Sequence, residues 1–187
     1  KLPDVLPDDQ ILTPQGSYGA QKAMGELLVS DMSRKGFIDG RALRLPTVTV
    51  RPGTPNKAAS SFASGMIREP LAGVAANVPV SPETKVWVQS PDRVIENILM
   101  GHEIPAAQFG GFSRAISVPG ISVSIGEMAE SLRRVAGDTV ADQLSWNPDP
   151  AIEKLVNTWP KAFSAERGRA MGMVADKNFD EIVRAHI

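Results

Sequence analysis

The 187 residues are 42% hydrophobic and 22% charged, which is typical of a globular protein with one core, or a core and a small lobe. The net charge of -1 and the absence of basic runs argue against nucleic-acid binding, and no apolar stretch approaches the roughly 20 residues that span a bilayer. The absence of cysteine excludes disulfides and zinc–thiolate sites. No Asn-x-Ser/Thr sequon occurs either, which favours the cytoplasm. Charge and hydropathy together predict a protein without nucleic-acid or membrane partners.

Residues 1–16 form a predicted extended loop, since Pro3, Pro7 and Pro14 disfavour a helix. The loop has no initiating Met and no resemblance to a signal peptide, so the true start and any targeting are left open, with a processed or trimmed start as the simple alternative. A helix is predicted from Ser17, as its N-cap, to about Lys35, with Gly36 ending it.

This first helix has two predicted apolar sides. One side carries Ala20, Ala23, Met24, Leu27 and Leu28, and the opposite side carries Tyr18, Lys22, Gly25, Val29 and Met32. A narrow polar stripe carries Glu26, Ser30 and Ser33. We therefore expect the helix to be sandwiched between its own sheet and either another layer or a second subunit.

Downstream, strands and helices alternate, which indicates an α/β fold. The predicted elements are a strand over Arg41–Val50, a helix over Asn56–Glu69 stopped by Pro70, a strand over Lys85–Gln89, a helix capped by Ser90 and Pro91 with an apolar stripe of Val94, Ile95, Ile98 and Leu99, a strand over Ala115–Val118, a helix with a Ser124–Glu127 capping box ending at Gly137, and a helix starting at Asp149 and Pro150. About three strands are too few for a complete parallel sheet, so a partner strand is expected before residue 1.

The most specific pattern is Tyr18-Gly19-Ala20-Gln21-Lys22. Residues four apart lie one turn apart on the same helix face, so the phenol and the ammonium can share a site. A free tyrosine has a pKa of about 10, and a nearby ammonium lowers that pKa by favouring the phenolate. Such a tyrosine can exchange a proton with a substrate hydroxyl during hydride transfer. The alternative is an exposed aromatic–lysine pair with no catalytic role.

The residues around this pair resemble the extended branch of the short-chain dehydrogenase/reductase family. Pro14 and Ser17 precede the pair, and the helix leads into Leu43-Arg44-Leu45-Pro46-Thr47-Val48, which is similar to a Leu-Arg-Pro-x-Asn-Val strand of that family. Later stretches that look like family landmarks, in the same order, are Phe62–Gly73, Val86–Val88 and Ala115–Gly120. Within the family, Leu45–Gly53 and Asn56–Gly65 look most like the D-erythronate dehydrogenases.

The resemblance implies the C-terminal part of a Rossmann-like doubly wound sheet plus a small substrate-binding lobe. Residues 1–53 would carry the catalytic helix and the following strand, and residues 54–187 mostly the substrate lobe with returning core elements. The family's glycine-rich pyrophosphate cradle and its catalytic Ser or Thr have no counterpart and would fall upstream of Lys1. We therefore expect a missing N-terminal dinucleotide-binding half, without which this chain is inactive.

The resemblance also implies roles for individual residues. Tyr18 would be the general acid–base, and Lys22 would lower its pKa and hold the nicotinamide ribose. The residues expected beside the nicotinamide of NAD are Leu45, Pro46, Thr47 and Val48. NADP is the alternative cofactor, because the discriminating residues would lie upstream. A homodimer built from paired catalytic helices is also implied.

Candidate substrate-binding residues follow the strand. Arg51 lies close to the expected substrate, and a guanidinium suits bidentate binding of a carboxylate, although it could instead cap loop carbonyls. Arg68 is a second candidate, or part of a solvated helix face. Ser60 and Ser61 could bind substrate hydroxyls, or simply begin a helix.

These features predict NAD-dependent oxidation of a secondary hydroxyl on a short sugar acid. A nucleotide-sugar epimerase or dehydratase is the alternative enzyme, but a nucleoside pocket usually needs an aromatic or apolar clamp rather than Arg51 and serines. A non-catalytic interaction module is the alternative from another class, which the retention of both Tyr18 and Lys22 disfavours. The two histidines, His102 and His186, lack metal-site spacing, so no metal is expected.

Overall fold

The computed structural model describes residues 2–54, 59–109 and 113–187. In this part of the chain the helices are α1 (Ser17–Arg34), α2 (Ser61–Leu71), α3 (Pro91–Glu103), α4 (Ala106–Phe109), α5 (Ile125–Ala136), α6 (Asp138–Ala141), α7 (Pro150–Val156), α8 (Glu166–Ala170) and α9 (Phe179–His186). The strands described are β1 (Ala42–Arg44), β2 (Thr47–Val48), β3 (Ala76–Val78), β4 (Lys85–Gln89), β5 (Ala115–Ser117), β6 (Ile121–Ser124) and β7 (Leu144–Trp146).

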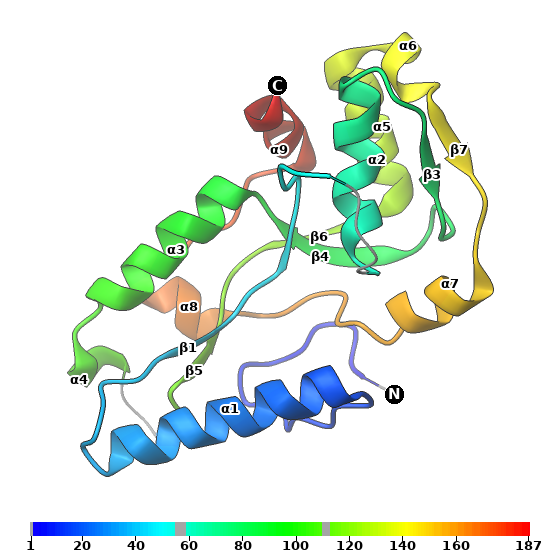
Figure 1. Cartoon of the computed structure of the whole chain (residues 1–187). Coiled ribbons are helices and arrows are strands. Elements are labelled where there is room, and N and C mark those ends of the chain that lie inside the picture. The colour runs from blue at the N-terminus through cyan, green and yellow to red at the C-terminus, as the bar shows by residue number, and fades with distance from the viewer. Residues whose placement is uncertain (1, 55–58, 110–112) are drawn as a thin grey trace.

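The strands form three small sheets. β1 pairs in parallel with β5, and β3 pairs in parallel with β7. In the third sheet, β4 lies between β2, which is parallel to it, and β6, which is antiparallel. Mostly parallel strands with covering helices confirm the predicted α/β class (Figure 1).

The predicted strand Arg41–Val50 is broken at Leu45 and Pro46, so that β1 and β2 belong to different sheets. Proline has no N–H to donate to a strand ladder, which explains the break. Gly120, between β5 and β6, lies beside the same point: a Cβ there would be 2.7 Å from the Val88 carbonyl oxygen and 2.9 Å from Pro46 Cγ. The segment from β1 to β2 and the segment from β5 to β6 therefore pass from one sheet to the other at neighbouring points, Pro46 and Gly120.

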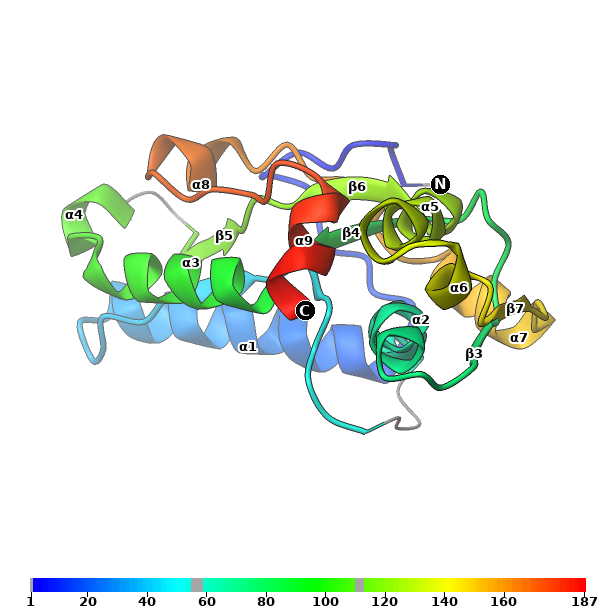
Figure 2. The same ribbon diagram turned by 90° about the horizontal axis from the view of Figure 1, so that it is seen from above.

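Helices α1 and α3 contact opposite faces of β1. Leu43 lies against α3, where a Cβ on Gly101 would come within 2.9 Å of Leu43 Cδ1. Arg44 points the other way and donates from Nε and Nη2 to the two carboxylate oxygens of Glu26 on α1, at 2.8 and 2.6 Å. Hydrogen bonding to Glu26 raises the pKa of Arg44. Adjacent strand residues point to opposite faces, so β1 and β5 are covered by a helix on each side (Figures 1 and 2).

The stripe of α1 that faces its own chain is the polar one. Besides the Glu26 ion pair, Ser30 Oγ accepts a hydrogen bond from the Arg114 N–H at 3.2 Å, and Ser33 Oγ accepts one from the Gly40 N–H at 3.0 Å. No α1 residue is buried, and the large apolar side chains Met24, Leu27 and Leu28 are 61%, 71% and 60% exposed. The helix was predicted to be covered on two apolar sides. In this chain it is covered on one side only, and that side includes its polar stripe.

The helix boundaries agree in part with the predictions. Gly16, not Ser17, is the N-cap of α1, whereas Gly36 ends the helix with a φ of +78° that suits glycine. The predicted helix Asn56–Glu69 begins later, at Ser61, and its segment 56–58 lies outside the described residues. Nor does Pro70 stop the helix, since α2 continues through its last turn to Leu71 with the Pro70 ring buried.

The caps predicted for three later helices are confirmed. Ser90 Oγ accepts from the Arg93 N–H, and Asp149 Oδ1 accepts from the Ala151 N–H, each at the start of its helix. Ser124 and Glu127 form the predicted capping box of α5, which ends before Gly137.

The buried apolar residues gather in two groups. The larger lies among α2, α5, α9 and the strands beside them, and includes Met66, Ile67 and Leu132. The smaller includes Phe109, Ile116 and Met173 near α3, α4 and α8. The sheet β2–β4–β6, with β4 in the middle, lies between the larger group of helices and the two-stranded sheet β1–β5 (Figure 1).

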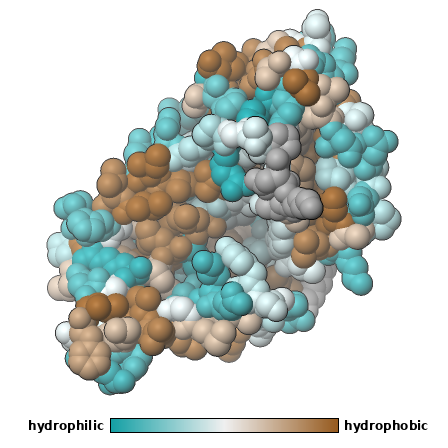
Figure 3. All heavy atoms as spheres, viewed as in Figure 1, coloured by the Kyte–Doolittle hydropathy of each residue, from teal (hydrophilic) through white to brown (hydrophobic). Residues whose placement is uncertain are grey.

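The apolar stripe predicted for α3 is mostly not covered in this chain. Val94 is buried, but Ile95, Ile98 and Leu99 are 55%, 43% and 61% exposed. In Figure 3 hydrophobic side chains gather on the surface over α3. Along its second edge, β1 has no strand partner among the described residues. The expected incomplete sheet with exposed apolar helix faces is therefore present.

The Glu26–Arg44 pair should contribute measurably to stability, because its side chains are only 17% and 19% exposed. Glu26→Ala leaves a half-buried guanidinium without its carboxylate and should lower the free energy of unfolding by about 1.5–3 kcal/mol. Asp31→Ala, which removes the exposed partner of Arg34 on the same helix, is the matched control and should change stability little. Urea unfolding gives the free energy of unfolding of both variants. Equal losses of stability would contradict a stabilising role of the Glu26–Arg44 pair.

Candidate functional site

Tyr18 and Lys22 lie on one face of α1, in its first and second turns, as the sequence predicts. The Lys22 ammonium is 5.3 Å from the centroid of the Tyr18 ring. Tyr18 is 75% exposed, and Lys22 has no ion pair with any described residue. The first turn of α1 lies on the same side of the molecule as the start of α2 in both views (Figures 1 and 2). Both polar groups are therefore open to a ligand on that side.

The four residues predicted beside the nicotinamide span the break between β1 and β2. Leu45 is 44% exposed, Pro46 is buried, and Thr47 and Val48 are half-buried. Thr47 and Val48 stand opposite Val88 and Gln89 of β4 in the parallel register. These residues form the end of a strand that continues directly into the loop carrying Arg51.

Arg51 is held by its main chain. Its N–H donates to Ser64 Oγ at 3.1 Å, and its carbonyl accepts from Arg68 Nη1 at 2.7 Å. Its guanidinium makes no hydrogen bond or ion pair with a described residue, although the side chain is half-buried. Ten of the other eleven arginines donate to a carboxylate or a main-chain carbonyl, and Arg184 forms an ion pair with Asp180 at 3.6 Å. Arg51 thus combines a fixed backbone with an uncommitted cationic group.

The other three candidate substrate residues are on or next to α2. Ser60 precedes the helix and makes no side-chain cap bond, while Ser61 is its first residue. Arg68, two turns further along, is only 14% exposed and gives Nη2 to Glu69 Oε1 at 2.5 Å as well as Nη1 to the Arg51 carbonyl. The guanidinium that caps a loop carbonyl is therefore that of Arg68, the role considered for Arg51.

Three residues of this site were not identified from the sequence. Thr49 is fully buried and donates from Oγ1 to the Ala63 carbonyl at 2.9 Å, and Ser64 Oγ donates to Thr49 Oγ1 at 3.4 Å. Glu69 pairs with Arg68, and its Oε2 is buried without a hydrogen-bond partner among the described residues. The spacing of Ser64 and Arg68, four residues apart on α2, was the available signal for such a cluster.

His186, at the end of α9, lies near this cluster. Burial lowers the pKa of His186, and the positive charge of Arg68 lowers it further, while Glu69 acts in the opposite direction. The neutral imidazole is therefore favoured in the folded protein.

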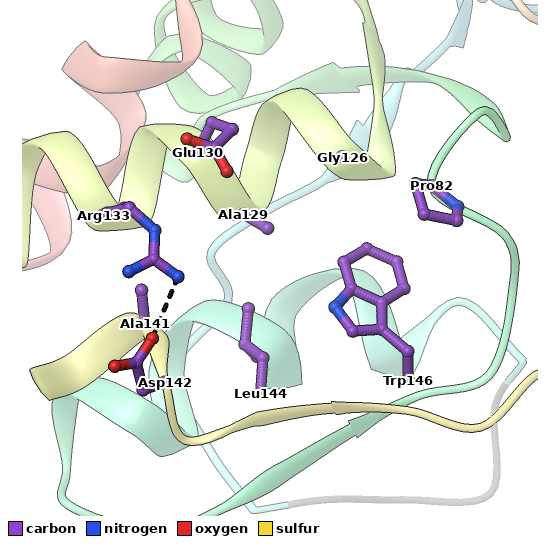
Figure 4. Close-up of a pocket in the computed structure, with 9 residues that line it drawn as sticks. All are labelled: Pro82, Gly126, Ala129, Glu130, Arg133, Ala141, Asp142, Leu144 and Trp146. Carbon is purple, nitrogen blue, oxygen red and sulfur yellow. Dashed lines mark hydrogen bonds and ion pairs between the residues drawn. The ribbon is translucent and has the colours of Figure 1, made fainter. Parts of the chain in front are cut away.

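Two cavities lie away from the predicted site residues. The larger, of about 540 Å³, lies between α5, α6 and β7, where Leu144 points toward Ala129 and Trp146 toward Gly126, at the start of α5 (Figure 4). Arg133, which also lines it, is paired with Asp142 at 3.0 Å. A smaller cavity, of about 300 Å³, lies beside α1 and Arg44. Neither is lined by a residue of the predicted site.

Neither a metal-ion site nor a membrane-spanning helix occurs among the described residues. Within residues 2–54, 59–109 and 113–187, no three His, Asp or Glu side chains are grouped so that they could hold a metal ion. None of the helices in that part of the chain is both long and apolar enough to cross a membrane.

Comparison with known proteins gives full-length matches to this chain. It is 54% identical over 187 residues to a D-erythronate dehydrogenase of Cupriavidus necator and 40% identical over 187 residues to one of Haemophilus influenzae. The crystal structure of a protein named as a nucleoside-diphosphate-sugar epimerase, from Agrobacterium tumefaciens, covers the whole chain with a TM-score of 0.95 and 42% identity. No family model matches the sequence.

The chain covers only part of each relative: 57% and 59% of the two dehydrogenases and 54% of the solved structure. It thus spans a little more than half the length of these proteins. With these matches, the α/β architecture is that of part of a Rossmann-like enzyme, as predicted.

The lowered pKa of His186 predicts a pH dependence of stability. In the unfolded chain His186 regains a pKa near 6.5 and binds a proton as the pH falls below that value, whereas the folded chain stays neutral to a lower pH. The free energy of unfolding should therefore fall from about pH 7 down to the folded pKa and then level off. Carboxylates with a lowered pKa, such as Asp180, act in a more acidic range.

Denaturant unfolding of the full-length protein, repeated across this pH range, measures the free energy of unfolding and checks the expectation. His186→Gln should flatten the pH dependence, whereas His102→Gln, at a side chain that is 82% exposed, should leave it as in the wild type. If the His186 variant keeps the wild-type slope, the assignment is wrong.

Proposed function

We propose that the chain belongs to the extended short-chain dehydrogenase/reductase family and forms the catalytic and substrate-binding part of an enzyme that oxidises a secondary hydroxyl of a short sugar acid with NAD. The names of the two curated relatives support an acid of the D-erythronate type. The structural observation that carries the proposal is the half-buried guanidinium of Arg51, in the loop after β2, which has no hydrogen bond or ion pair with a described residue.

Tyr18 and Lys22 are the proposed acid–base pair. Tyr18 is proposed to take the hydroxyl proton of the substrate, with the Lys22 ammonium one turn away on the same helix face. As that proton leaves, the carbinol carbon loses a hydride and becomes a carbonyl carbon, so the substrate loses two electrons. NAD, when bound, supplies the hydride acceptor. The 5.3 Å approach of Lys22 to the Tyr18 ring and the exposure of both groups support this role.

The residues present fit only the nicotinamide end of the cofactor. Lys22 has an uncommitted ammonium that could bind ribose hydroxyls, and Leu45, Pro46, Thr47 and Val48 are proposed to lie beside the nicotinamide. A glycine-rich loop that opens a helix, which would cradle the pyrophosphate, does not occur in the sequence. The choice between NAD and NADP would be made by residues outside this chain.

An upstream dinucleotide-binding half is therefore part of the proposal. The second edge of β1 and the exposed Ile95, Ile98 and Leu99 of α3 offer a strand edge and an apolar face for it to cover. Residues 1–53 would contribute the catalytic helix and its following strand, and residues 54–187 mostly the substrate lobe with returning core elements. On this account the chain alone is inactive.

We also propose that two copies of the protein form a homodimer through α1. Met24, Leu27 and Leu28 are more than half exposed, on a helix whose inward contacts are polar. Pairing of this face with that of a second copy would remove the exposed apolar surface from water.

Arg51 is the proposed carboxylate-binding residue, with Ser60 and Ser61 positioned on the following segment to bind substrate hydroxyls. A guanidinium binds a carboxylate through two parallel hydrogen bonds, which fixes orientation as well as charge. With its backbone held at both N–H and carbonyl, Arg51 needs to order only its side chain on binding.

A nucleotide-sugar epimerase or dehydratase is the second candidate. The epimerase name of the Agrobacterium tumefaciens protein, which is 42% identical, supports it. The dehydrogenase names of the two curated relatives favour the sugar acid. Arg51, whose guanidinium has no partner among the described residues, favours it too, since no aromatic side chain lies among the candidate substrate residues. A non-catalytic module would have no need for an uncommitted Tyr18–Lys22 pair.

Replacement of Tyr18 by Phe in the full-length enzyme should lower turnover by about 10²–10⁴-fold, because only the acid–base hydroxyl is lost. Cofactor affinity and thermal stability should stay near wild type, since the ring is exposed. Lys22→Met should lower both turnover and cofactor affinity. Steady-state kinetics and cofactor titration measure these effects, and a near-normal rate for Tyr18→Phe would remove this residue from the mechanism.

The Arg51→Gln enzyme should lose about ten- to hundredfold in kcat/KM for a sugar acid, and little for its uncharged analogue. The reason is that only the acid can form the charge-assisted pair. Arg134→Gln, at an exposed arginine of α5, is the control and should retain wild-type kinetics. If wild type and Arg51→Gln show the same preference for the acid, Arg51 does not bind the carboxylate.

A further inference from the structure

The loop after β2 is fastened to α2 by a chain of four hydrogen bonds. Thr49 Oγ1 donates to the Ala63 carbonyl, Ser64 Oγ donates to Thr49 Oγ1, the Arg51 N–H donates to Ser64 Oγ, and Arg68 Nη1 donates to the Arg51 carbonyl. Thr49 and Ser64 are 0% and 1% exposed. The main chain at Arg51 is therefore held on both sides of its Cα by side chains of one helix.

The last of these bonds uses a charged group. Arg68 and Glu69 are each 14% exposed, and Glu69 Oε1 accepts from Arg68 Nη2 at 2.5 Å. The other carboxylate oxygen, Oε2, is buried and lies where a Cβ on Gly65 would come within 3.0 Å. Removing an ion pair from water costs free energy, so a pair placed under a loop carbonyl is an unfavourable way to satisfy one hydrogen bond.

The cost of burying the Arg68–Glu69 pair is explained if the main chain of Arg51 has to be held in one position. A neutral donor or water would satisfy a loop carbonyl with less desolvation. A guanidinium instead gives a short, directional, charge-assisted bond, and Glu69 restrains the guanidinium that donates it. The direction in which the Arg51 side chain leaves the backbone is set by the peptide plane that Arg68 holds.

We propose that Arg68, restrained by Glu69, is a positioning residue that fixes the main chain of Arg51 so that its guanidinium meets the substrate carboxylate. This inference rests on the proposed function, in which Arg51 binds an acid. It assigns Arg68 a role through Arg51, in place of direct contact with the substrate. The cost of misplacing a binding group by a fraction of an ångström falls on substrate binding more than on the chemical step.

The test is a double-mutant cycle in the full-length enzyme, assayed with a sugar acid and its uncharged analogue. Arg68→Met should raise KM for the acid about tenfold, change kcat less than about threefold and leave cofactor affinity unchanged. Arg68→Lys should recover most of the loss, because an ammonium can still donate to the Arg51 carbonyl and pair with Glu69. In the Arg51→Gln background, Arg68→Met should add less than about twofold. Arg134→Met is the control for loss of an exposed arginine.

A second readout does not depend on catalysis. Since the charge of Arg68 lowers the pKa of His186, Arg68→Met should raise that pKa, and Arg68→Lys should leave it lowered. Proton NMR titration of His186 reports whether each variant retains the cluster. If Arg68→Met fails to fold, Glu69→Gln replaces it in the cycle, with a severalfold rise in KM for the acid as the expected result.

The outcomes separate the two proposals. If Arg51→Gln keeps the wild-type preference for the acid, the proposed function is wrong. If Arg51→Gln loses the preference while Arg68→Met behaves as wild type, the positioning role is overturned and the proposed function stands. If the two effects multiply in the double variant, Arg68 acts independently of Arg51, which also overturns the positioning role.

Discussion

The parallel pair β1–β5 is the constraint on which the rest of this structure depends. It is covered by α1 on one face and α3 on the other, and in the described chain β1 has no neighbour along its second edge. The Glu26–Arg44 pair and two serine contacts fasten α1 to this remnant by polar interactions, which leaves Tyr18, Lys22 and the large apolar side chains of the helix exposed. The chain therefore presents the proposed catalytic pair, and the apolar side of the same helix, at its surface.

Most arginines of this molecule hold its elements together, and Arg51 does not. Arg41, Arg44 and Arg114 bind carboxylates or carbonyls that tie β1 and its neighbours together, and Arg68 does the same for the loop after β2. Arg51 differs, because its main chain is fixed while its guanidinium is unused among the described residues. A rigid backbone with a free charged group is the arrangement that a selective binding site requires.

Local sequence signals predicted much of the fold. The α1 helix, the β4 strand and the caps at Ser90, Ser124 and Asp149 follow from residues near in sequence. The strands β3, β6 and β7 have only three or four residues, too few for a periodic pattern, and the break at Pro46 depends on strands far along the chain. For the site, spacing predicted the Tyr18–Lys22 face. The commitment of Arg68 to Arg51 and Glu69 could not be predicted, because it depends on the tertiary placement of α2.

The central claim is that this chain supplies the acid–base pair and the acid-recognising arginine of a sugar-acid dehydrogenase whose dinucleotide cradle lies elsewhere. The most direct measurement is the formation of reduced nicotinamide by the full-length protein and by residues 1–187 alone, each given NAD and either D-erythronate or a nucleotide sugar. The account predicts reduction only by the full-length protein and only with the acid. Turnover of the nucleotide sugar instead of the acid, or reduction by the 187-residue chain alone, would contradict it.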